Sequence, residues 1–550
     1  MRDASKLDKV NAIERKKRIT LKNKLVSGTF WLSAANMICK ILGIVYLIPW
    51  LMFMGNYQDQ HQAQALYNVA YLPYALFLSL GTAGFPSGIA KKIAELSHQK
   101  DQSRPRELFR SALAVMEVIG IISAILMFIF ASALSKISPV ANQEAAIYAI
   151  RSLCPSLLII PILSAIRGYF QGSNLIMPFG ISQVIEQLVR VLVIIGGTYY
   201  IRVVAGGDIL SAVVISTFAS CIGGIVAIIY LVVLGKRVGL FRLRDFFILP
   251  LHYLRKSKEV TLGIIKESLP FVYVGSVVSL MQLIDQVSLK PIIHFLKPTM
   301  SQAQLETLYT FASANPNKLT PLLLSIIGSI TVTSLPLLST LRRKEDLLTG
   351  ISDTLRLSLT VLLPSSIGMI LLSIPLNTIF FGYNLEGSMY LALAIAATFL
   401  TGIFTVLLSI LQALNAHRKA IYFTTQVLFF KLICQVPLVY FFEGMGMSLA
   451  SIASLIISVI GVYRFITKTF DIHPLSYVRR YYLKVLQATF AMEVVCILCF
   501  IGLSHILAMS SKIHSVIFVV CIALVGAMVF MGMVFGKNIK QLVLNFFHSS

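Results

Sequence analysis

The stretch LSAANMICKILGIVYLIPWLMFMG, residues 32–55, decides the fold class, because it is a long apolar run that contains a single charged residue, Lys40. The run begins near residue 25 and is long enough to cross a hydrocarbon layer about 30 Å thick as a helix. Lys40 would then lie near the middle of the layer, where a lysine costs on the order of 3 kcal/mol. The stretch therefore predicts a membrane helix on which Lys40 faces water or an anionic ligand.

The composition extends this reading to the whole chain. Of its 550 residues, 57% are hydrophobic and 13% are charged, whereas a soluble protein carries about 25% charged residues. Continuous apolar blocks fit helices and exclude the alternating pattern of a membrane barrel. We expect an all-α polytopic membrane protein with 14 transmembrane helices. The expected spans are 25–54, 64–90, 110–134, 145–166, 178–201, 208–235, 263–289, 317–341, 357–380, 386–414, 421–442, 446–466, 485–508 and 513–536.

The positive charges are distributed unevenly between the two sides of these spans. Most of the 47 lysines and arginines lie in the N-terminus, the even-numbered connections and the C-terminus. This bias predicts a multi-pass protein with both termini in the cytoplasm. The net charge of +24 is explained by orientation and by contact with anionic lipid, so nucleic acid is not an expected partner. The odd-numbered connections hold only Lys136, Arg202, Lys290, Lys297, Lys318 and Lys512.

A basic segment at 236–262 separates six spans from eight, and the two sides resemble each other. The stretch SAIRGYFQGSNLIMPFGISQVIEQ at 164–187 matches SILQALNAHRKAIYFTTQVLFFK at 409–431, and the second and eighth spans match at a similar offset. The duplication predicts two six-helix lobes with a substrate site between them near the midplane. The expected regions are a basic N-terminus (1–24), an N-lobe (25–235), a linker (236–262), a C-lobe (263–470) and an appendix of two helices with a tail (471–550).

Charged residues inside the spans are the main carriers of chemistry. The sequence contains no GxxxxGK[ST], HExxH or GxSxG motif, so we expect a transporter, not an enzyme, with no cofactor and no metal. Intramembrane charges normally face a bundle interior or a water-filled cavity, and an excess of cations suits an anionic substrate. The proposed substrate-binding residues are Lys40, Arg151, Arg190, Lys318 and Lys431, and the proposed cavity acids or coupling residues are Glu186, Asp285 and Gln282.

Most of these residues also have a structural interpretation. Glu186 and Arg190 lie four residues apart and so share a helix face, where they can form a salt bridge that only staples the bundle. Lys431 can pair with Glu186 or with another acid, Asp285 can act as an interfacial cap, and Lys318 can lie on a loop surface. A cavity role is favoured most strongly for Lys40, because no acid lies one turn away on its own helix.

Several stretches resemble the polysaccharide-transporter branch of the MOP exporter superfamily, and in particular the MurJ-like lipid II flippases of Gram-positive bacteria. They are LVSGTFWLSAANMICKILGIVYLIPW, RGYFQGSNLIMPFGISQVIEQLVRV, LPFVYVGSVVSLMQLIDQ and TSLPLLSTL. The resemblance implies a V of two six-helix lobes around a cationic cavity, with two extra C-terminal helices forming a groove for a lipid tail. It also implies that Lys40 contacts a pyrophosphate, and it places Lys318 near the position of a family arginine at the start of the eighth span.

By this resemblance the protein lies in the bacterial plasma membrane and turns lipid II, an undecaprenyl-pyrophosphate-linked peptidoglycan precursor, from the inner to the outer leaflet. Cell-wall synthesis proteins are possible partners. A flippase for another undecaprenyl-linked glycan, such as capsule, teichuronic acid or exopolysaccharide, would share the fold and the cationic cavity. A cation-coupled multidrug antiporter is a weaker alternative, because cationic drugs require an acidic cavity and acids are scarce within the spans.

Overall fold

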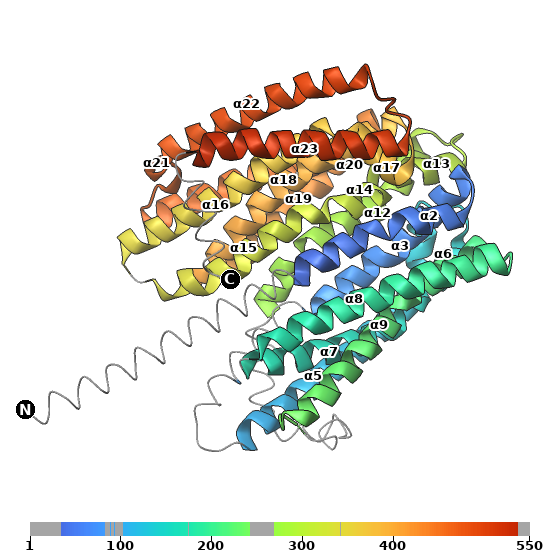
Figure 1. Ribbon diagram of the computed structural model, residues 1–550. Coiled ribbons are helices and arrows are strands. Elements are labelled where there is room, and N and C mark those ends of the chain that lie inside the picture. Colours follow the sequence, from blue (N-terminus) through green and yellow to red (C-terminus); the bar gives the residue numbers. More distant parts are fainter. Residues whose placement is uncertain are drawn as a thin grey trace, which may run out of the picture.

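The computed structural model describes residues 35–82, 89, 93, 103–173, 175–241, 269–341 and 343–536. These residues form helices and short connections, with no strand among them, so the all-α prediction is confirmed. The long helices run roughly along one direction, as expected for a membrane bundle (Figure 1). The predicted N-terminal segment, the greater part of the linker and the C-terminal tail lie outside the described residues.

The number of spans differs from the prediction of fourteen. Eleven described helices are long and apolar enough to cross a membrane, and a twelfth span results if Leu269–Gly275 and Val277–Leu296, bent by 50°, are counted together. The other two predicted spans correspond to the helices α3 (Tyr57–Thr82) and α15 (Pro321–Thr340), which do not meet the same test within the described residues. One reason is that α3 begins with the polar sequence YQDQHQAQ. The count of fourteen is therefore not confirmed.

The first half of the chain forms one group of neighbouring helices (Figure 1). Its first helix covers Ala35–Met54 with a turn at Tyr46, after which the segment is labelled α2. Inside the group α8 packs along α9, and α5 packs along α7. The elements are α2 (Leu47–Met54), α3 (Tyr57–Thr82), α5 (Ser103–Ile137), α6 (Gln143–Ser152), α7 (Cys154–Gly172), α8 (Ile176–Tyr199), the π-helix η1 (Tyr200–Val204) and α9 (Ile209–Arg237).

The second half forms a neighbouring group, and the last two helices lie along its outer flank (Figure 1). The helices α22 and α23 pack on α16 and α17 through an apolar cluster of their own that includes Val485 and Phe518. The elements are α12 (Val277–Leu296), α13 (Gln302–Tyr309), η3 (Thr310–Ala314), α14 (Pro316–Leu319), α15 (Pro321–Thr340), α16 (Lys344–Leu371), α17 (Ser373–Phe381), α18 (Leu385–Ala413), α19 (His417–Phe442), α20 (Gly444–Phe470), α21 (Pro474–Tyr477), α22 (Arg479–Ser504) and α23 (Lys512–Phe535).

Polar side chains start several helices at one end of the bundle, the end where α13 is labelled in Figure 1. Asn142, Asp208 and Asn384 each accept a backbone N–H of the following helix, and Ser301 forms a capping box with Gln304. These caps satisfy amides that would otherwise lack a partner at a helix start. The connections at this end are the ones poor in lysine and arginine, so we refer to it as the cation-poor end and predict that it faces outward.

Contacts between the two halves gather around α3. Asn68 Nδ2 donates to Tyr309 Oη over 2.7 Å, and Gln286 Nε2 donates to the Val69 carbonyl over 3.2 Å. Toward the other end of α3, the hydroxyls of Ser79 and Ser276 lie 2.7 Å apart. The apolar core is continuous across the halves, since one buried cluster includes residues of both. The helix α3 is therefore the central element on which the halves meet.

Candidate functional site

Three charged side chains of the first half form one buried network. Glu186 on α8 accepts from Arg190 Nη2 over 2.8 Å through one carboxylate oxygen and from Arg167 Nη2 over 2.9 Å through the other. Their side chains are 14%, 18% and 10% exposed, respectively. One carboxylate thus serves two guanidinium groups, and the network keeps a surplus positive charge in surroundings that screen charge poorly.

The local structure of α7, α8 and α9 fixes this network. Arg167 lies near the end of α7, and its Nε donates to Ser182 Oγ on α8 over 2.9 Å, which holds the guanidinium toward Glu186. Gly223 lies on α9 where a Cβ would come within 2.6 Å of the Glu186 carbonyl oxygen. The absence of a side chain at Gly223 therefore allows α9 to pack directly on the α8 backbone at the network.

Lys40 lies on the first helix, beside this network. The helix approaches α8 one turn later, since a Cβ on Gly43 would lie 3.4 Å from Gln187 Nε2. Lys40 is exposed and interacts electrostatically with Arg190, and it forms no ion pair with any described residue. We call Lys40, Arg167, Glu186 and Arg190 the cationic centre, because it combines three cations with one carboxylate.

A row of tyrosines leads from the cationic centre to the second half. Tyr67, Tyr71 and Tyr74 share one face of α3, with ring centroids 5.8 Å and 5.6 Å apart between successive members, and all three interact electrostatically with Arg190. The Tyr74 hydroxyl is buried without a hydrogen-bond partner. At the other end of the row, Lys318 Nζ lies 3.5 Å from the centroid of the Tyr67 ring. A cation over an aromatic face is stabilised by about 2 kcal/mol when it is desolvated.

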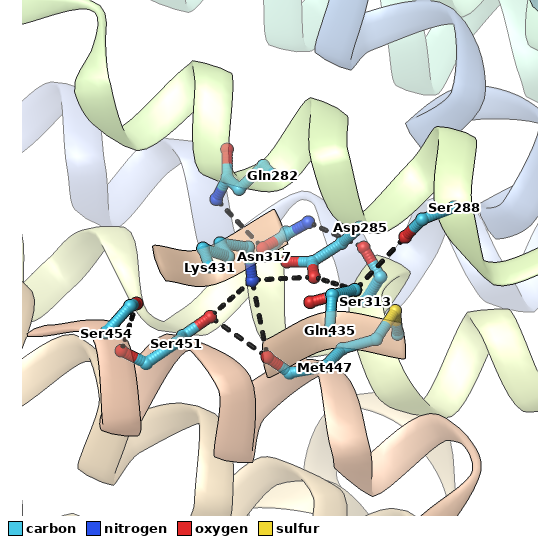
Figure 2. Close-up of polar contacts among 10 residues, drawn as sticks. All are labelled: Gln282, Asp285, Ser288, Ser313, Asn317, Lys431, Gln435, Met447, Ser451 and Ser454. Carbon is cyan, nitrogen blue, oxygen red and sulfur yellow. Dashed lines mark hydrogen bonds and ion pairs between the residues drawn. The ribbon is translucent and has the colours of Figure 1, made fainter. Parts of the chain in front are cut away.

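The second half contains a separate, nearly neutral polar centre (Figure 2). The fully buried Lys431 on α19 donates to Asp285 Oδ1 on α12 over 2.8 Å, to Ser451 Oγ on α20 over 2.6 Å and to the Met447 carbonyl over 3.3 Å. Gln435 Nε2 also donates to Asp285 Oδ1 over 2.8 Å. All three ammonium protons are therefore used, and Lys431 pairs with Asp285, an acid other than Glu186.

Gln282 lies one turn before Asp285 and donates to Asn317 Oδ1 over 2.9 Å, as Figure 2 shows. A cavity of ≈ 70 Å³ borders Gln282, Asp285 and Ser451. This volume holds at most a few water molecules. The polar centre therefore contains protonatable groups beside a small space, but it has no room for a large headgroup.

The structure does not bring all the predicted residues together. Arg151 lies at the end of α6 with its guanidinium carbon 4.2 Å from the centroid of the Phe128 ring, apart from both centres. Arg167 is absent from the predicted site residues, although the quoted RGYFQG stretch begins with it, because it lies just beyond the predicted span 145–166. The tyrosine row is absent as well, and its spacing of four and three residues along α3 is the signal that indicates it.

Comparisons with known proteins place the chain in a family. The sequence profile of the family described as polysaccharide biosynthesis protein matches residues 25–341, more than half of the chain. The chain belongs to the polysaccharide biosynthesis protein family. A similar member is the lipid II flippase MurJ of Bacillus subtilis (strain 168), 29% identical over 463 residues that cover 81% of this chain and 83% of the relative. The stage V sporulation protein B of the same organism is 28% identical over 45% of this chain and 46% of its own length.

Solved structures show the same fold at low sequence identity. A lipid II flippase MurJ in an inward closed conformation superposes with a TM-score of 0.65 at 15% identity, covering 93% of this chain and 99% of that chain. An inward-facing multidrug resistance MATE family transporter of the MOP superfamily gives a TM-score of 0.55 at 15% identity, covering 80% and 95%. The expected family resemblance and MOP-type fold are therefore confirmed. The relatives named as a flippase and as a MATE family transporter support the prediction that this chain is a transporter and not an enzyme.

Proposed function

We propose that this chain is a flippase that carries an undecaprenyl-pyrophosphate-linked glycan precursor, lipid II, from the inner to the outer leaflet by alternating access. The observation that carries the proposal is the cationic centre, in which Arg167 and Arg190 share the single carboxylate of Glu186 and Lys40 has no acid of its own. The similarity to a protein named lipid II flippase over 81% of this chain supports the choice of substrate.

The side chains of the cationic centre suit a pyrophosphate. Guanidinium groups bind phosphate oxygens through paired hydrogen bonds, and the buried Tyr74 hydroxyl without a partner adds a donor nearby. A pyrophosphate that enters beside Lys40 and Arg190 balances their surplus charge, which is the condition under which a buried cation is tolerated. Meanwhile the prenyl tail stays in the bilayer, which avoids a cost of about 0.8 kcal/mol for each CH₂ group that would be extracted from lipid.

The energy source that we propose is the membrane potential. The sequence contains no P-loop for nucleotide hydrolysis. A potential of 100 mV acting on one moving charge supplies about 2.3 kcal/mol. A cavity that carries surplus positive charge moves that charge when the lobes rearrange. Dissipating the potential in otherwise intact cells should therefore slow the appearance of lipid II outside, and an unchanged rate contradicts this part of the proposal.

The test of the function is a depletion experiment in the host cell. Lipid II outside the membrane is quantified with a membrane-impermeant probe after depletion of the protein, and each variant is then supplied back. We expect wild type to restore external lipid II and Lys40→Ala to fail. The matched control is Lys344→Ala, which removes an exposed ion pair with Asp471 outside the cationic centre and should restore external lipid II like wild type.

The outcomes separate the function from the site. If Lys40→Ala also restores external lipid II, the flippase proposal is supported and the assignment of Lys40 is wrong. If depletion leaves external lipid II unchanged in a strain with no other lipid II flippase, the substrate is another undecaprenyl-linked glycan or a different molecule. The same depleted cells then reveal which lipid-linked precursor accumulates on the inside.

A further inference from the structure

A second, much larger cavity lies at the cation-poor end of the bundle, apart from both charged centres. Its volume is ≈ 880 Å³, which is within the range of cavities that hold small organic ligands. Both halves of the chain line it: the start of α3 contributes Tyr57 and His61, and the second half contributes α13, the start of α18 and the turn between α19 and α20. A ligand in this cavity would therefore touch both lobes.

The charge of the cavity is opposite to that of the cationic centre. Three carboxylates line it, Glu306, Glu386 and Glu443, together with the ammonium of Lys297. Lys297 forms an ion pair with Glu443, so these two charges compensate each other. Among the described residues, neither Glu306 nor Glu386 forms an ion pair. Two carboxylates thus face the cavity without a cationic partner.

Two side chains of the wall are buried and incompletely paired. Glu306 is 6% exposed, and its Oε2 accepts the Ala141 N–H over 3.1 Å, an interaction that joins the two halves. His61 is 5% exposed, and its Nε2 has no hydrogen-bond partner. The His61 ring lies between Tyr57 and Phe311, with centroid distances of 4.1 Å and 5.1 Å. A buried imidazole nitrogen without a partner beside an open cavity indicates a place where a ligand supplies the missing hydrogen bond.

Burial also sets the protonation of these groups. It raises the pKa of Glu306 to about 7 and lowers the pKa of His61 to about 4. His61 is therefore neutral at pH 7, and Glu306 gains its negative charge as the pH rises through neutrality. A bound cation would favour the charged form of Glu306.

We propose that this cavity is a binding site for a primary ammonium group carried by a polar, uncharged chain, such as a peptide side chain or an amino sugar. Glu306 and Glu386 pair with the ammonium, the aromatic rings of Tyr57 and Phe311 contact its carrier, and the amides of Gln58, Gln62 and Gln304 bind the polar chain. The inference rests on the proposed function in one respect, the identity of the molecule that carries the ammonium group. If the chain is a lipid flippase, this molecule is the headgroup of the transported lipid, which meets the cavity at the outward-facing end.

The proposal is tested by equilibrium binding to the full chain in nanodiscs, with soluble probes that require no transport. The probes are the peptide acetyl-Ala-Lys-Ala-amide, its Nε-acetylated form and glucosamine. We expect saturable binding of the peptide and a loss of about tenfold or more in affinity when its amine is acetylated, since a charge-assisted hydrogen bond is then removed. Stronger binding of glucosamine than of the peptide would identify an amino sugar as the carrier.

Variants locate the binding in this cavity. Glu306→Gln and Glu386→Gln should each weaken peptide binding about tenfold, whereas Glu345→Gln, at the start of α16 outside the cavity, should leave it unchanged. Thermal melting of each variant in the same nanodiscs tests whether the variant is folded. Glu386 is exposed at the start of α18, so its substitution should perturb the fold little.

The pH profile is a readout that a purely structural role would not produce. Affinity for the peptide should rise between pH 6 and 8 in wild type as Glu306 ionises, and the rise should disappear in Glu306→Gln. Burial raises the pKa of Tyr57 and lowers the pKa of His61 to about 4, so neither produces this rise. The other charged groups that line the cavity, Lys297, Glu386 and Glu443, are present in both proteins. Equal binding of the acetylated peptide, or no saturable binding of either amine, overturns the proposal. Neither result affects the flippase proposal, which is judged by external lipid II alone.

Discussion

At the scale of single residues, the two buried centres differ in how completely acids compensate their cations. In the second half, Lys431 has Asp285 as a partner and all its donors are used, so this centre is close to neutral. In the first half, Glu186 is divided between two arginines, and positive charge is left over. A surplus charge in a poorly screened site attracts an anion, whereas a compensated pair mainly holds helices together.

Removing only one partner of the compensated pair should strongly destabilise the protein. Lys431→Met leaves Asp285 buried without its cation, so we expect a loss of about 3–5 kcal/mol in the free energy of unfolding. The double variant Lys431→Met/Asp285→Asn should recover most of that loss, because no unpaired charge remains. Thermal melting of the purified proteins in detergent measures both.

The control for this prediction is Lys297→Met, which breaks an exposed ion pair with Glu443 and should cost less than about 1 kcal/mol. If Lys431→Met melts at the wild-type temperature, then Asp285 is accommodated without Lys431 at no loss in the free energy of unfolding. In that case the Lys431–Asp285 pair does not stabilise the fold, and the prediction is wrong.

At the scale of secondary-structure elements, the closeness of α8 and α9 sets the position of the cationic centre. The Glu186 carbonyl and the Gly223 Cα face each other with no room for a side chain. Glu186 in turn holds Arg167 of α7 and Arg190 of its own helix. A displacement of α8 would therefore also shift the three charged side chains that are bonded together in the cationic centre.

Gly223→Ala tests this dependence. The new methyl group would overlap with the α8 backbone, and we expect a destabilisation of about 1–3 kcal/mol together with reduced external lipid II in depleted cells. Gly196→Ala on α8 is the matched control, since its methyl group would meet no atom within 4 Å. That substitution should be neutral or stabilise the helix by up to about 1 kcal/mol. Equal effects of the two variants would show that close approach at Gly223 is unimportant.

At the scale of the whole molecule, hydrogen bonds between the halves accompany the apolar packing near the cation-poor end. Gln286 is fully buried there, and its Nε2 donates to Ser138 Oγ over 2.9 Å and to the Val69 carbonyl over 3.2 Å. Hydrogen bonds of this kind contribute about 1 kcal/mol each. Each is weak enough to break and re-form if the halves separate during transport.

Gln286→Leu should therefore shift the molecule toward states in which the cation-poor end is open. The loss of about 1–2 kcal/mol corresponds to a five- to thirtyfold change in population. Spin labels on the exposed residues Glu144 and Gln302, one in each half, report the separation by pulsed electron resonance. Thr349→Ala, which removes a bond only to its own helix backbone, should leave the distance distribution as in wild type. An unchanged distribution in Gln286→Leu contradicts the role of these contacts.

The sequence by itself determined the all-helical membrane class, the family and the excess of cations over acids among the spans. These follow from apolar block length, from motifs within single stretches and from the cost of charge in lipid, all of which are local properties of the chain. The count of fourteen spans stays a prediction, because α3 and α15 do not meet the length and hydropathy test within the described residues.

Only the tertiary structure decided which charges meet. Arg167 and Glu186 lie nineteen residues apart on two helices, and Lys431 and Asp285 are separated by 146 residues, so no spacing rule could pair them. The same holds for the large cavity, whose wall combines the start of α3 with segments of the second half. The physical reason is that electrostatic pairing and cavity shape depend on distances across helix interfaces, whereas a sequence pattern specifies only which residues share one helix face.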